Sequence, residues 1–288
     1  MEKKTAVVSK NANVENKPNA VGSLFASIVI PVAIIACVLI YMFVLGNPAN
    51  FEGNDPNNHP LPGNYLGIVY KGGWVVPVLM SLNLMVFIFS IERALTIGKA
   101  KGTKSVAEFV RVISAKLNQR DINGAIASCD TQKGSVANVV KAGLLKYKEM
   151  QNEPELLKAE KVAAIQKEIE ESTSLELPML EKNLVVISTI ASISTLVGLI
   201  GTVLGMIKAF SALATSGAPD SVALANGISE ALINTALGIT GSTIAIIAYN
   251  YFTSKIDVLT YSIDEAGFSM VSTFAAQHDT PAARPQTV

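Results

Sequence analysis

The sequence predicts an all-α integral membrane protein with four transmembrane helices and a helical cytoplasmic domain. Half of its 288 residues are hydrophobic, and its mean hydropathy is +0.39. The charged residues are gathered into blocks separated by long uncharged stretches, whereas a soluble domain would spread them along the chain. A helix that crosses a bilayer needs about 20 apolar residues at about 1.5 Å per residue. Four stretches meet this requirement: 24–45, 74–91, 183–207 and 223–252.

The positions of Lys and Arg predict the orientation, because the cytoplasmic segments of membrane proteins are enriched in both. If the four spans alternate, the N-terminus, the large middle segment and the C-terminus share one side, which holds 21 of the 23 basic residues. Lys71 and Lys208 are the exceptions. We therefore expect a multi-pass membrane protein with both termini in the cytoplasm.

This topology divides the chain into consecutive segments. They are a disordered cytoplasmic tail (1–23), a transmembrane helix (24–45), a periplasmic loop rich in Gly, Pro and Asn (46–71), a second transmembrane helix (72–92), a cytoplasmic helical domain (93–182), a third transmembrane helix (183–212), a short periplasmic loop (213–222), a fourth transmembrane helix (223–253) and a cytoplasmic tail (254–288). The first apolar run is longer than the core of a signal peptide, which has about 7–15 residues, so we expect a retained helix rather than a cleaved one.

Apolar residues recur at helical spacing within the cytoplasmic domain. Residues 105–129 predict two short amphipathic helices interrupted near 118–123, and 135–150 predict another. A long helix is expected after Pro154, whose fixed φ suits a first helical turn. Pro178 is expected to kink or end that helix just before the third span. The charged faces of these helices are expected to be solvated surface.

Signatures of soluble enzymes are absent from the sequence, which holds no P-loop, GxGxxG, HExxH or GxSxG motif. His59 and His278 lie in polar segments without a plausible ligand cluster. Cys37 lies in the first span and Cys129 in the soluble segment, so they are not expected to pair. Basic residues are not interleaved with aromatic ones, which argues against nucleic-acid binding. We expect no enzymatic activity, no metal site and no cofactor.

Glu230 is the most informative residue of the chain, because no other charged residue lies between 221 and 254. A carboxylate inside a membrane span costs about 2.5–3.5 kcal/mol on insertion scales, so it usually faces a protein interior or a water-filled path. The default hypothesis is an ion or proton pathway. The alternative is that Glu230 lies near the end of its helix and reaches the membrane interface.

Small and polar residues form a stripe on each of the last two spans when successive positions are placed about 100° apart. In the fourth span they are Glu230, Ala231, Asn234, Thr235, Gly238, Gly241, Ser242 and Ala245. In the third span they are Ser188, Ala191, Thr195, Gly198, Thr202 and Gly205, and Gly201 forms a GxxxG pair with Gly205.

Such stripes have two readings. Small residues allow membrane helices to approach closely, so the stripes could serve helix packing alone. Hydroxyl groups also donate and accept hydrogen bonds, so Thr202 and Thr235 could pass protons together with Glu230. Two matching stripes and one carboxylate favour a lined path. No Asp lies in either stripe, so water or another chain would have to complete a proton relay.

Three stretches of the sequence carry specific motifs. Residues 72–97 end in Ile91-Glu92-Arg93-Ala-Leu-Thr-Ile, residues 198–206 read Gly-Leu-Ile-Gly-Thr-Val-Leu-Gly-Met, and residues 227–232 read Gly-Ile-Ser-Glu-Ala-Leu. Together they resemble the three core spans of the ExbB/TolQ/MotA proton-channel family, and most of all its ExbB/TolQ branch. The resemblance covers roughly residues 72–257. It makes the helix at 24–45 an addition to a three-span ExbB-like core.

The resemblance implies that Thr202, Glu230 and Thr235 line the channel. It also implies a homo-oligomeric ring of five copies around one pore. Two single-span ExbD/TolR-like helices would sit inside this pore, and each would bring an Asp. Proton entry would drive rotation and act on a TonB/TolA-like partner that reaches the outer membrane. One departure is Ile244, which stands where the family usually has Pro in the last span.

Three classes of function remain open. The first is a motor subunit driven by the proton-motive force, which would serve TonB-dependent uptake, Tol-type envelope maintenance, or a gliding or flagellar motor. The second is a secondary transporter with Glu230 as its coupling site, although inverted repeats and broken helices are not evident. The third is a membrane scaffold in which the two polar stripes only pack helices. Glycines 198, 201 and 205 are expected to allow close helix contact, and Asn234 to hydrogen-bond Glu230 or a neighbouring subunit.

Overall fold

The computed structural model describes residues 20–214 and 221–277 of the chain. These residues are mainly helical, and the β pairing among them is a single antiparallel bridge between Phe51 and Pro60. The all-α fold class is therefore confirmed. The helices are α1 (Ala20–Leu39), the π-helix η1 (Ile40–Leu45), the short 3₁₀ turns η2 (Pro48–Asn50), η3 (Glu52–Asn54) and η4 (Gly73–Val75), α2 (Tyr65–Tyr70), α3 (Val76–Lys101), α4 (Val106–Asn118), α5 (Ile122–Gln132), α6 (Gly134–Gln151), α7 (Lys158–Glu181), α8 (Leu184–Ala214) and α9 (Ser221–Gln277).

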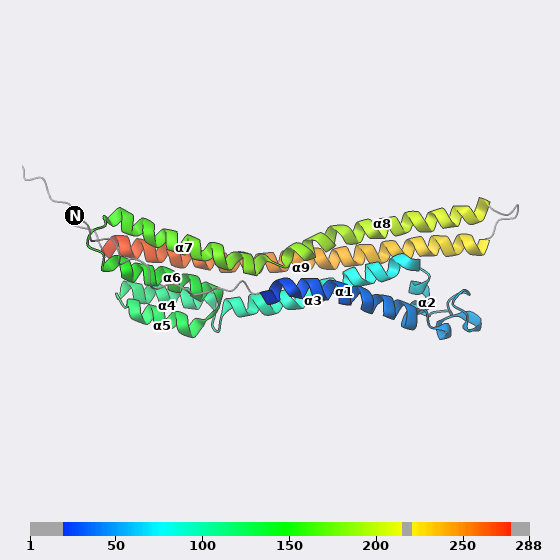
Figure 1. The fold of residues 1–288 in the computed structure, drawn as a ribbon, viewed down its shortest axis with the longest axis horizontal. Coiled ribbons are helices and arrows are strands. Elements are labelled where there is room, and N and C mark those ends of the chain that lie inside the picture. Colours follow the sequence, from blue (N-terminus) through cyan, green and yellow to red (C-terminus); the bar gives the residue numbers. More distant parts are fainter. Residues whose placement is uncertain (1–19, 215–220, 278–288) are drawn as a thin grey trace, which may run out of the picture.

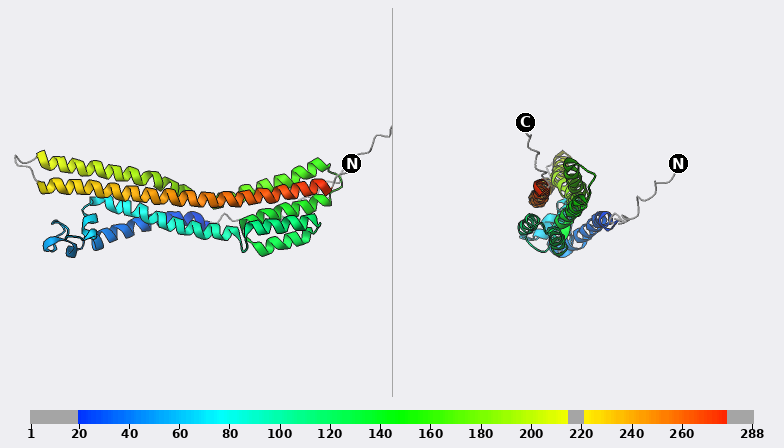
Figure 2. Two further views of the ribbon diagram at one scale, coloured as in Figure 1. Left: turned by 180° about the vertical axis from the view of Figure 1, so that it is seen from behind. Right: turned by 90° about the vertical axis from the view of Figure 1, so that its left-hand side faces the viewer.

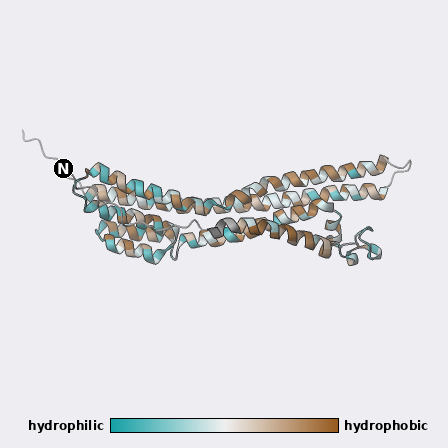
Figure 3. Ribbon diagram, viewed as in Figure 1, coloured by the Kyte–Doolittle hydropathy of each residue, from teal (hydrophilic) through white to brown (hydrophobic). Residues whose placement is uncertain are grey.

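The molecule is elongated and has two halves along its long axis (Figure 1). In one half α3 packs against the α8–α9 pair and α1 packs against α3. In the other half α4, α6 and α7 pack against the end of α9, and α5 packs against α4 and α6. Hydrophobic residues dominate α1, α8 and the first half of α9, whereas hydrophilic residues are frequent over α4 to α7 (Figure 3). This division corresponds to the membrane part and the cytoplasmic domain that the charge pattern predicts.

Four stretches of helix within the described residues are long and apolar enough to cross a membrane: Phe25–Leu45, Gly73–Asn118, Lys158–Ala214 and Ser221–Gln277. Each of them contains one of the four predicted spans, so their number is confirmed. The last three extend well beyond the predicted span ends because the transmembrane helices continue into the helical domain or are joined to its helices. The chain is therefore a multi-pass membrane protein whose spans and soluble domain share helices.

Helix α9 is continuous over 57 residues, which corresponds to about 85 Å at the usual helical rise. Figure 2 shows it running along the whole molecule. The part of the predicted cytoplasmic tail from residue 254 to Gln277 is helical and belongs to α9. Its apolar residues recur every three or four positions and are buried against α4, α6 and α7, as an amphipathic helix requires. They are Ile256, Leu259, Ile263, Ala266, Met270 and Phe274. Residues 1–19 of the expected tail at 1–23 lie outside the described residues, and 20–23 belong to α1. Residues 278–288 of the expected tail at 254–288, with His278, and most of the loop at 213–222 also lie outside them.

The helical domain differs from the expected pattern at one proline. The interruption near 118–123 is confirmed, since α4 ends at Asn118 and Asp121 caps α5 by accepting a hydrogen bond from Gly124 N at 2.8 Å. Pro154 is not in a first helical turn, because α7 begins only at Lys158. Leu157 precedes it, and its backbone N donates to the Glu160 carboxylate at 2.8 Å. The Glu160 side chain therefore satisfies one of the free N–H groups at the start of the helix. A proline side chain has no oxygen that could accept such a bond.

Pro178 lies inside α7, which ends three residues later at Glu181. Helix α8 begins at Leu184, so the helical path breaks between the cytoplasmic helix and the third span. This agrees with the expectation that the proline ends the helix there. The free carbonyl groups at the end of α7 have a partner in Arg93, which is described below.

The loop at 46–71 has more internal structure than its composition suggests. Phe51 is fully buried and packs edge-on against the Tyr70 ring, with 5.4 Å between the ring centres. Asn64 caps α2 by accepting hydrogen bonds from the backbone N of Leu66 and Gly67. Lys71 donates to two loop carbonyls, those of Pro56 and Asn57. Partial burial lowers the pKa of the Lys71 ammonium, and the nearby Asp55 carboxylate opposes this shift.

Candidate functional site

Glu230 lies in the third turn of α9 and is buried. The small and polar face of α9 is turned inward with it, since Ala231, Asn234, Gly238, Gly241, Ser242 and Ala245 are all buried. On the opposite face the large residues Leu232, Ile239, Ile246 and Ile247 are exposed. The predicted sidedness of this helix is therefore confirmed. Glu230 faces protein rather than the apolar surface.

Lys208 of α8 is the partner of Glu230. Its Nζ atom lies 2.6 Å from Glu230 Oε1, which is a charge-assisted hydrogen bond. The sequence showed Lys208 only as an exception to the charge asymmetry, and it did not reveal this contact. The pairing depends on the register between α8 and α9, which becomes visible only when both helices are placed.

The turn before α3 covers the same carboxylate. Gly73 has a φ of +77°, and a Cβ built on it would lie 2.5 Å from Glu230 Oε1. Its neighbour Gly72 accepts a hydrogen bond through its carbonyl oxygen from Asn234 Nδ2, at 2.8 Å. Asn234 Nδ2 thus binds the covering turn rather than Glu230, and the alternative bond to a neighbouring subunit stays a prediction. Asn234 Oδ1 is buried and has no hydrogen-bond partner among the described residues.

The hydroxyl groups of Thr202 and Thr235 are in direct hydrogen-bond contact between α8 and α9. Thr235 Oγ1 also lies 3.1 Å from the Ala231 carbonyl oxygen, and Thr202 Oγ1 lies 3.2 Å from that of Gly198. Both threonines are half-buried. The structure therefore brings together the two hydroxyl groups that the sequence had selected, one helical turn from Glu230. A pair of hydroxyls can both donate and accept, which a proton relay requires.

The third-span stripe divides into two edges. Gly198, Gly201 and Gly205 are buried against α9, and a Cβ on any of them would lie within about 3 Å of atoms in Asn234, Gly238 or Ala231. Ser188 and Thr195 are instead exposed on the other edge and do not join the α8–α9 contact. Ser242 takes part in this contact, since its hydroxyl donates to the Ala191 carbonyl at 2.6 Å. Ser194, which the sequence analysis did not select, is fully buried at the same contact.

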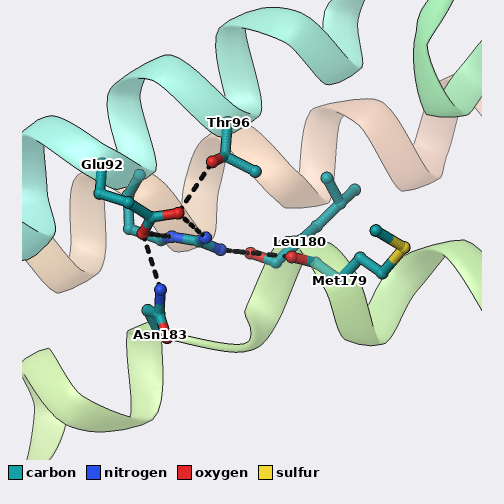
Figure 4. Close-up of polar contacts among 6 residues, drawn as sticks. Glu92, Thr96, Met179, Leu180 and Asn183 are labelled. Atoms are coloured by element: carbon teal, nitrogen blue, oxygen red, sulfur yellow. Dashed lines mark hydrogen bonds and ion pairs between the residues drawn. The ribbon is translucent and has the colours of Figure 1, made fainter. Parts of the chain in front are cut away.

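A second polar cluster connects α3 to the junction of α7 and α8 (Figure 4). Arg93 is buried and forms an ion pair with Glu92, with Nη2 at 2.5 Å from Oε1. It also donates to the carbonyl oxygens of Leu180 at 2.8 Å and Met179 at 3.3 Å. Asn183 Nδ2 donates to Glu92 Oε2 at 2.8 Å. In the sequence the motif Ile91-Glu92-Arg93 indicates a family resemblance, and an acid beside a base at the end of an apolar run also indicates an ion pair at the end of a span.

The described residues contain no group of three or more His, Cys, Asp or Glu side chains that could hold a metal ion. Both cysteines are free and buried within the described ranges. Burial raises the pKa of the Cys129 thiol to about 12, with a smaller contribution from the negative charge of Asp130. This thiol is therefore protonated at neutral pH.

Comparison with known proteins points to one family. Residues 133–265, which include Thr202, Lys208, Glu230 and Thr235, match the model of the MotA/TolQ/ExbB proton channel family. The Tol-Pal system protein TolQ of Pseudomonas aeruginosa is 32% identical over 124 residues, which are 43% of this chain and 54% of that protein. The biopolymer transport protein ExbB of Helicobacter pylori is 42% identical over 80 residues, 28% of this chain and 55% of that protein.

A second TolQ, from Haemophilus influenzae, is 37% identical over 84 residues, 29% of this chain and 37% of that protein. The chain thus matches about half or less of the length of these curated relatives. The segment that matches the family model contains α8, the membrane half of α9, and Glu230 with Lys208, whereas the Gly72–Gly73 turn lies outside it. Residues 133–265 are therefore similar to the MotA/TolQ/ExbB proton channel family, and the similarity to TolQ and ExbB proteins points the same way.

Proposed function

We propose that this chain is an ExbB-like subunit of an inner-membrane motor that is driven by the proton-motive force and energises TonB-dependent transport across the outer membrane. The observation that carries the proposal is Glu230, a buried carboxylate in an apolar helix, one turn from two touching hydroxyl groups. A buried ionisable group inside a span is a functional site by default. The name of the Helicobacter pylori relative, a biopolymer transport protein, supports the transport role.

In this proposal Glu230 accepts and releases the proton, and Thr202 and Thr235 orient water along its path. Lys208 balances the charge of Glu230 whenever the carboxylate is ionised. Gly198, Gly201 and Gly205 bring α8 and α9 together, so that the hydroxyls of the two helices meet. Each proton that crosses a potential of 100 mV supplies about 2.3 kcal/mol, so a motor of this kind must combine many protons.

The site also suggests why the protein would assemble. Ser188 and Thr195 are exposed on the edge of α8 that continues from Thr202, and in a ring of copies this edge can line a shared pore. We propose a homo-oligomer of five copies in the bacterial inner membrane. A single-span ExbD/TolR-like protein inside the pore would bring the Asp that both polar stripes lack, and a TonB/TolA-like protein would receive the mechanical work.

The similarity to two TolQ proteins favours a second candidate within the same class. In it the same motor would act on a TolA-like partner and maintain the envelope instead of driving uptake. A gliding-type motor would use the same core. In this proposal the TonB-like or TolA-like partner decides which of these motors the chain serves, and the membrane part is the same for each motor.

The first test is the native mass of the complex extracted gently from its own membrane, with each co-purifying chain identified. We expect about five copies of this chain with a small single-span protein that carries an intramembrane Asp. The accompanying TonB-like or TolA-like chain would then identify the branch. A monomer or dimer without such a partner, under conditions that preserve related rings, would contradict the motor.

The second test replaces Glu230 with Gln, which keeps the shape of the side chain but removes its titratable proton. We expect loss of energised transport with an unchanged native mass. Glu171→Gln on the exposed face of α7 is the matched control and should have full activity. Full activity of Glu230→Gln would instead favour a scaffold. Loss of activity without any dependence on a single-span partner would favour a secondary transporter.

A further inference from the structure

The first helix ends in a π-helical turn, η1 (Ile40–Leu45), which contacts the end of α2. The Tyr41 ring stacks on the Tyr70 ring, with 4.7 Å between the ring centres and an interplanar angle of 23°. The Tyr41 hydroxyl also donates to the Tyr70 carbonyl oxygen at 3.1 Å. One side chain of the additional helix therefore holds both the side chain and the backbone of Tyr70.

A second set of contacts attaches the intervening loop to the same turn. Asn50 Nδ2 donates to the carbonyl oxygens of Val44 at 2.8 Å and Leu45 at 2.9 Å, which are free because the helix ends there. Asn64, the N-cap of α2, donates to Asn50 Oδ1 at 3.0 Å. Both ends of α2 are thus attached to η1, the start through Asn50 and the end through Tyr41.

Tyr70 stands two and three residues before the glycines that cover Glu230. A Cβ on Gly73 would lie 2.5 Å from Glu230 Oε1, and the Gly72 carbonyl accepts the hydrogen bond of Asn234. Lys71, between them, is held by its bonds to the loop carbonyls of Pro56 and Asn57. Whatever moves Tyr70 must therefore move the cover over the carboxylate.

We propose that Tyr41 is a positioning residue: it holds the Gly72–Gly73 turn closed over Glu230, so that the additional first helix restricts access to this carboxylate from the side of the 46–71 loop. The proposal rests on the proposed role of Glu230 and gives a function to the helix that precedes the three-span core. On its other side Glu230 is paired with Lys208, whose side chain is 53% exposed.

The test measures how fast a hydrophobic carbodiimide modifies Glu230, in native membranes that contain the chain with its own partners and no proton gradient. Mass spectrometry of the Glu230 peptide gives the rate, and the exposed Glu171 serves as the internal reference. If the cover opens and closes rapidly, this rate follows the fraction of open cover. We expect Tyr41→Ala to raise the rate at least about tenfold, because the stack and the hydrogen bond are both lost.

Tyr41→Phe keeps the stack and removes only the hydrogen bond to Tyr70, so it should raise the rate by about two- to tenfold. This variant keeps the proposal testable if Tyr41→Ala does not assemble. The matched control is Phe43→Ala, two residues away on the same turn, whose side chain is 70% exposed. Its rate should equal that of the unaltered protein.

Two results would overturn the proposal. One is a rate for both Tyr41 variants equal to that of the unaltered protein, in complexes of unchanged native mass. The other is an equal acceleration by Phe43→Ala, which would indicate a general loosening of the helix. These results are independent of the motor hypothesis, because labelling needs no transport. Conversely, full activity of Glu230→Gln would refute the motor and leave the measured effect of Tyr41 on the cover intact.

Discussion

Lys208 of α8 and Glu230 of α9 form an ion pair whose two members differ strongly in their exposure to solvent. The Glu230 side chain is 9% exposed and that of Lys208 is 53% exposed, although their charged atoms are 2.6 Å apart. The ammonium group can therefore remain hydrated while it compensates a carboxylate that the protein has removed from water. If the pair is broken, most of the unfavourable free energy therefore comes from the buried Glu230 carboxylate.

Replacing Lys208 with Met should reduce energised transport at least tenfold and lower the free energy of unfolding by about 1 kcal/mol, a small value because the lysine is half exposed. Lys208→Arg keeps the charge and should retain most of the activity. The midpoint of thermal unfolding of the solubilised complex reports the stability change. In a Glu230→Gln background the Lys208→Met change should cost clearly less, because the partner charge is already gone. An equal cost in both backgrounds would show that the ion pair has no energetic role.

The Gly72–Gly73 cover also predicts different effects of mutating two glycines that have nearly the same φ. Gly73 has a φ of +77° beside Glu230, whereas Gly63 has a φ of +79° with no atom within 4 Å of a Cβ built on it. Gly63→Ala should cost about 1–2 kcal/mol of stability from the left-handed conformation alone. Gly73→Ala should cost more than this and should also reduce transport, because its methyl group displaces the Glu230 carboxylate. If Gly73→Ala lost no more stability than Gly63→Ala and kept normal transport, the contact of the Gly72–Gly73 turn with Glu230 would have no functional role.

The inward direction of Glu230 could be predicted from the sequence because α9 has a regular period. Small residues at Ala231, Gly238 and Gly241 share one face, and a membrane helix buries such a face where it meets another helix. The stripe on α8 did not indicate which of its residues would contact α9. At about 100° per residue it is about 100° wide, so its glycine edge meets α9 while Ser188 and Thr195 remain on the outer edge.

The partners of Glu230 could not be predicted, for two physical reasons. The contact with Lys208 depends on how far α8 is shifted along α9, and a helical period contains no information about that shift. The contact with Gly73 depends on a positive φ in a turn between α2 and α3, and many glycines of the chain have no such conformation. The continuation of α9 to Gln277 was hidden for another reason, because Asp, Glu and Ser between its buried residues resemble a solvated tail.

That continuation predicts that the end of α9 contributes to the stability of the cytoplasmic domain. Phe274 is fully buried and packs edge-on against Tyr147 of α6, with ring centres 4.8 Å apart. Phe274→Ala should lower the free energy of unfolding by about 3–5 kcal/mol, the usual loss for a buried Phe. Phe268→Ala on the same helix is the matched control, because this ring is 76% exposed, and it should change stability by less than about 0.5 kcal/mol. Similar thermal midpoints for the two variants would contradict a packed role for residues 254–277.

Arg93 predicts another large loss of stability, because one buried cation connects α3 with the end of α7. It neutralises Glu92 within α3 and at the same time satisfies the carbonyl groups of Leu180 and Met179 at the end of α7. Arg93→Met leaves the Glu92 carboxylate with only uncharged donors, such as Asn183, and frees both carbonyls. Removing one member of a buried pair costs about 3–5 kcal/mol, and we expect a loss of this size in thermal unfolding.

Arg93→Lys separates charge from geometry, since a lysine keeps the positive charge but cannot bind a carboxylate and two carbonyls with one planar group. We expect it to recover only part of the loss. Arg111→Met on the exposed face of α4 is the control and should be close to neutral. The double change Glu92→Gln with Arg93→Met should be more stable than Arg93→Met alone, because no uncompensated carboxylate remains. If the double variant is instead as unstable as the sum of the single changes, the loss arises from the α7 carbonyls, and the ion pair with Glu92 is secondary.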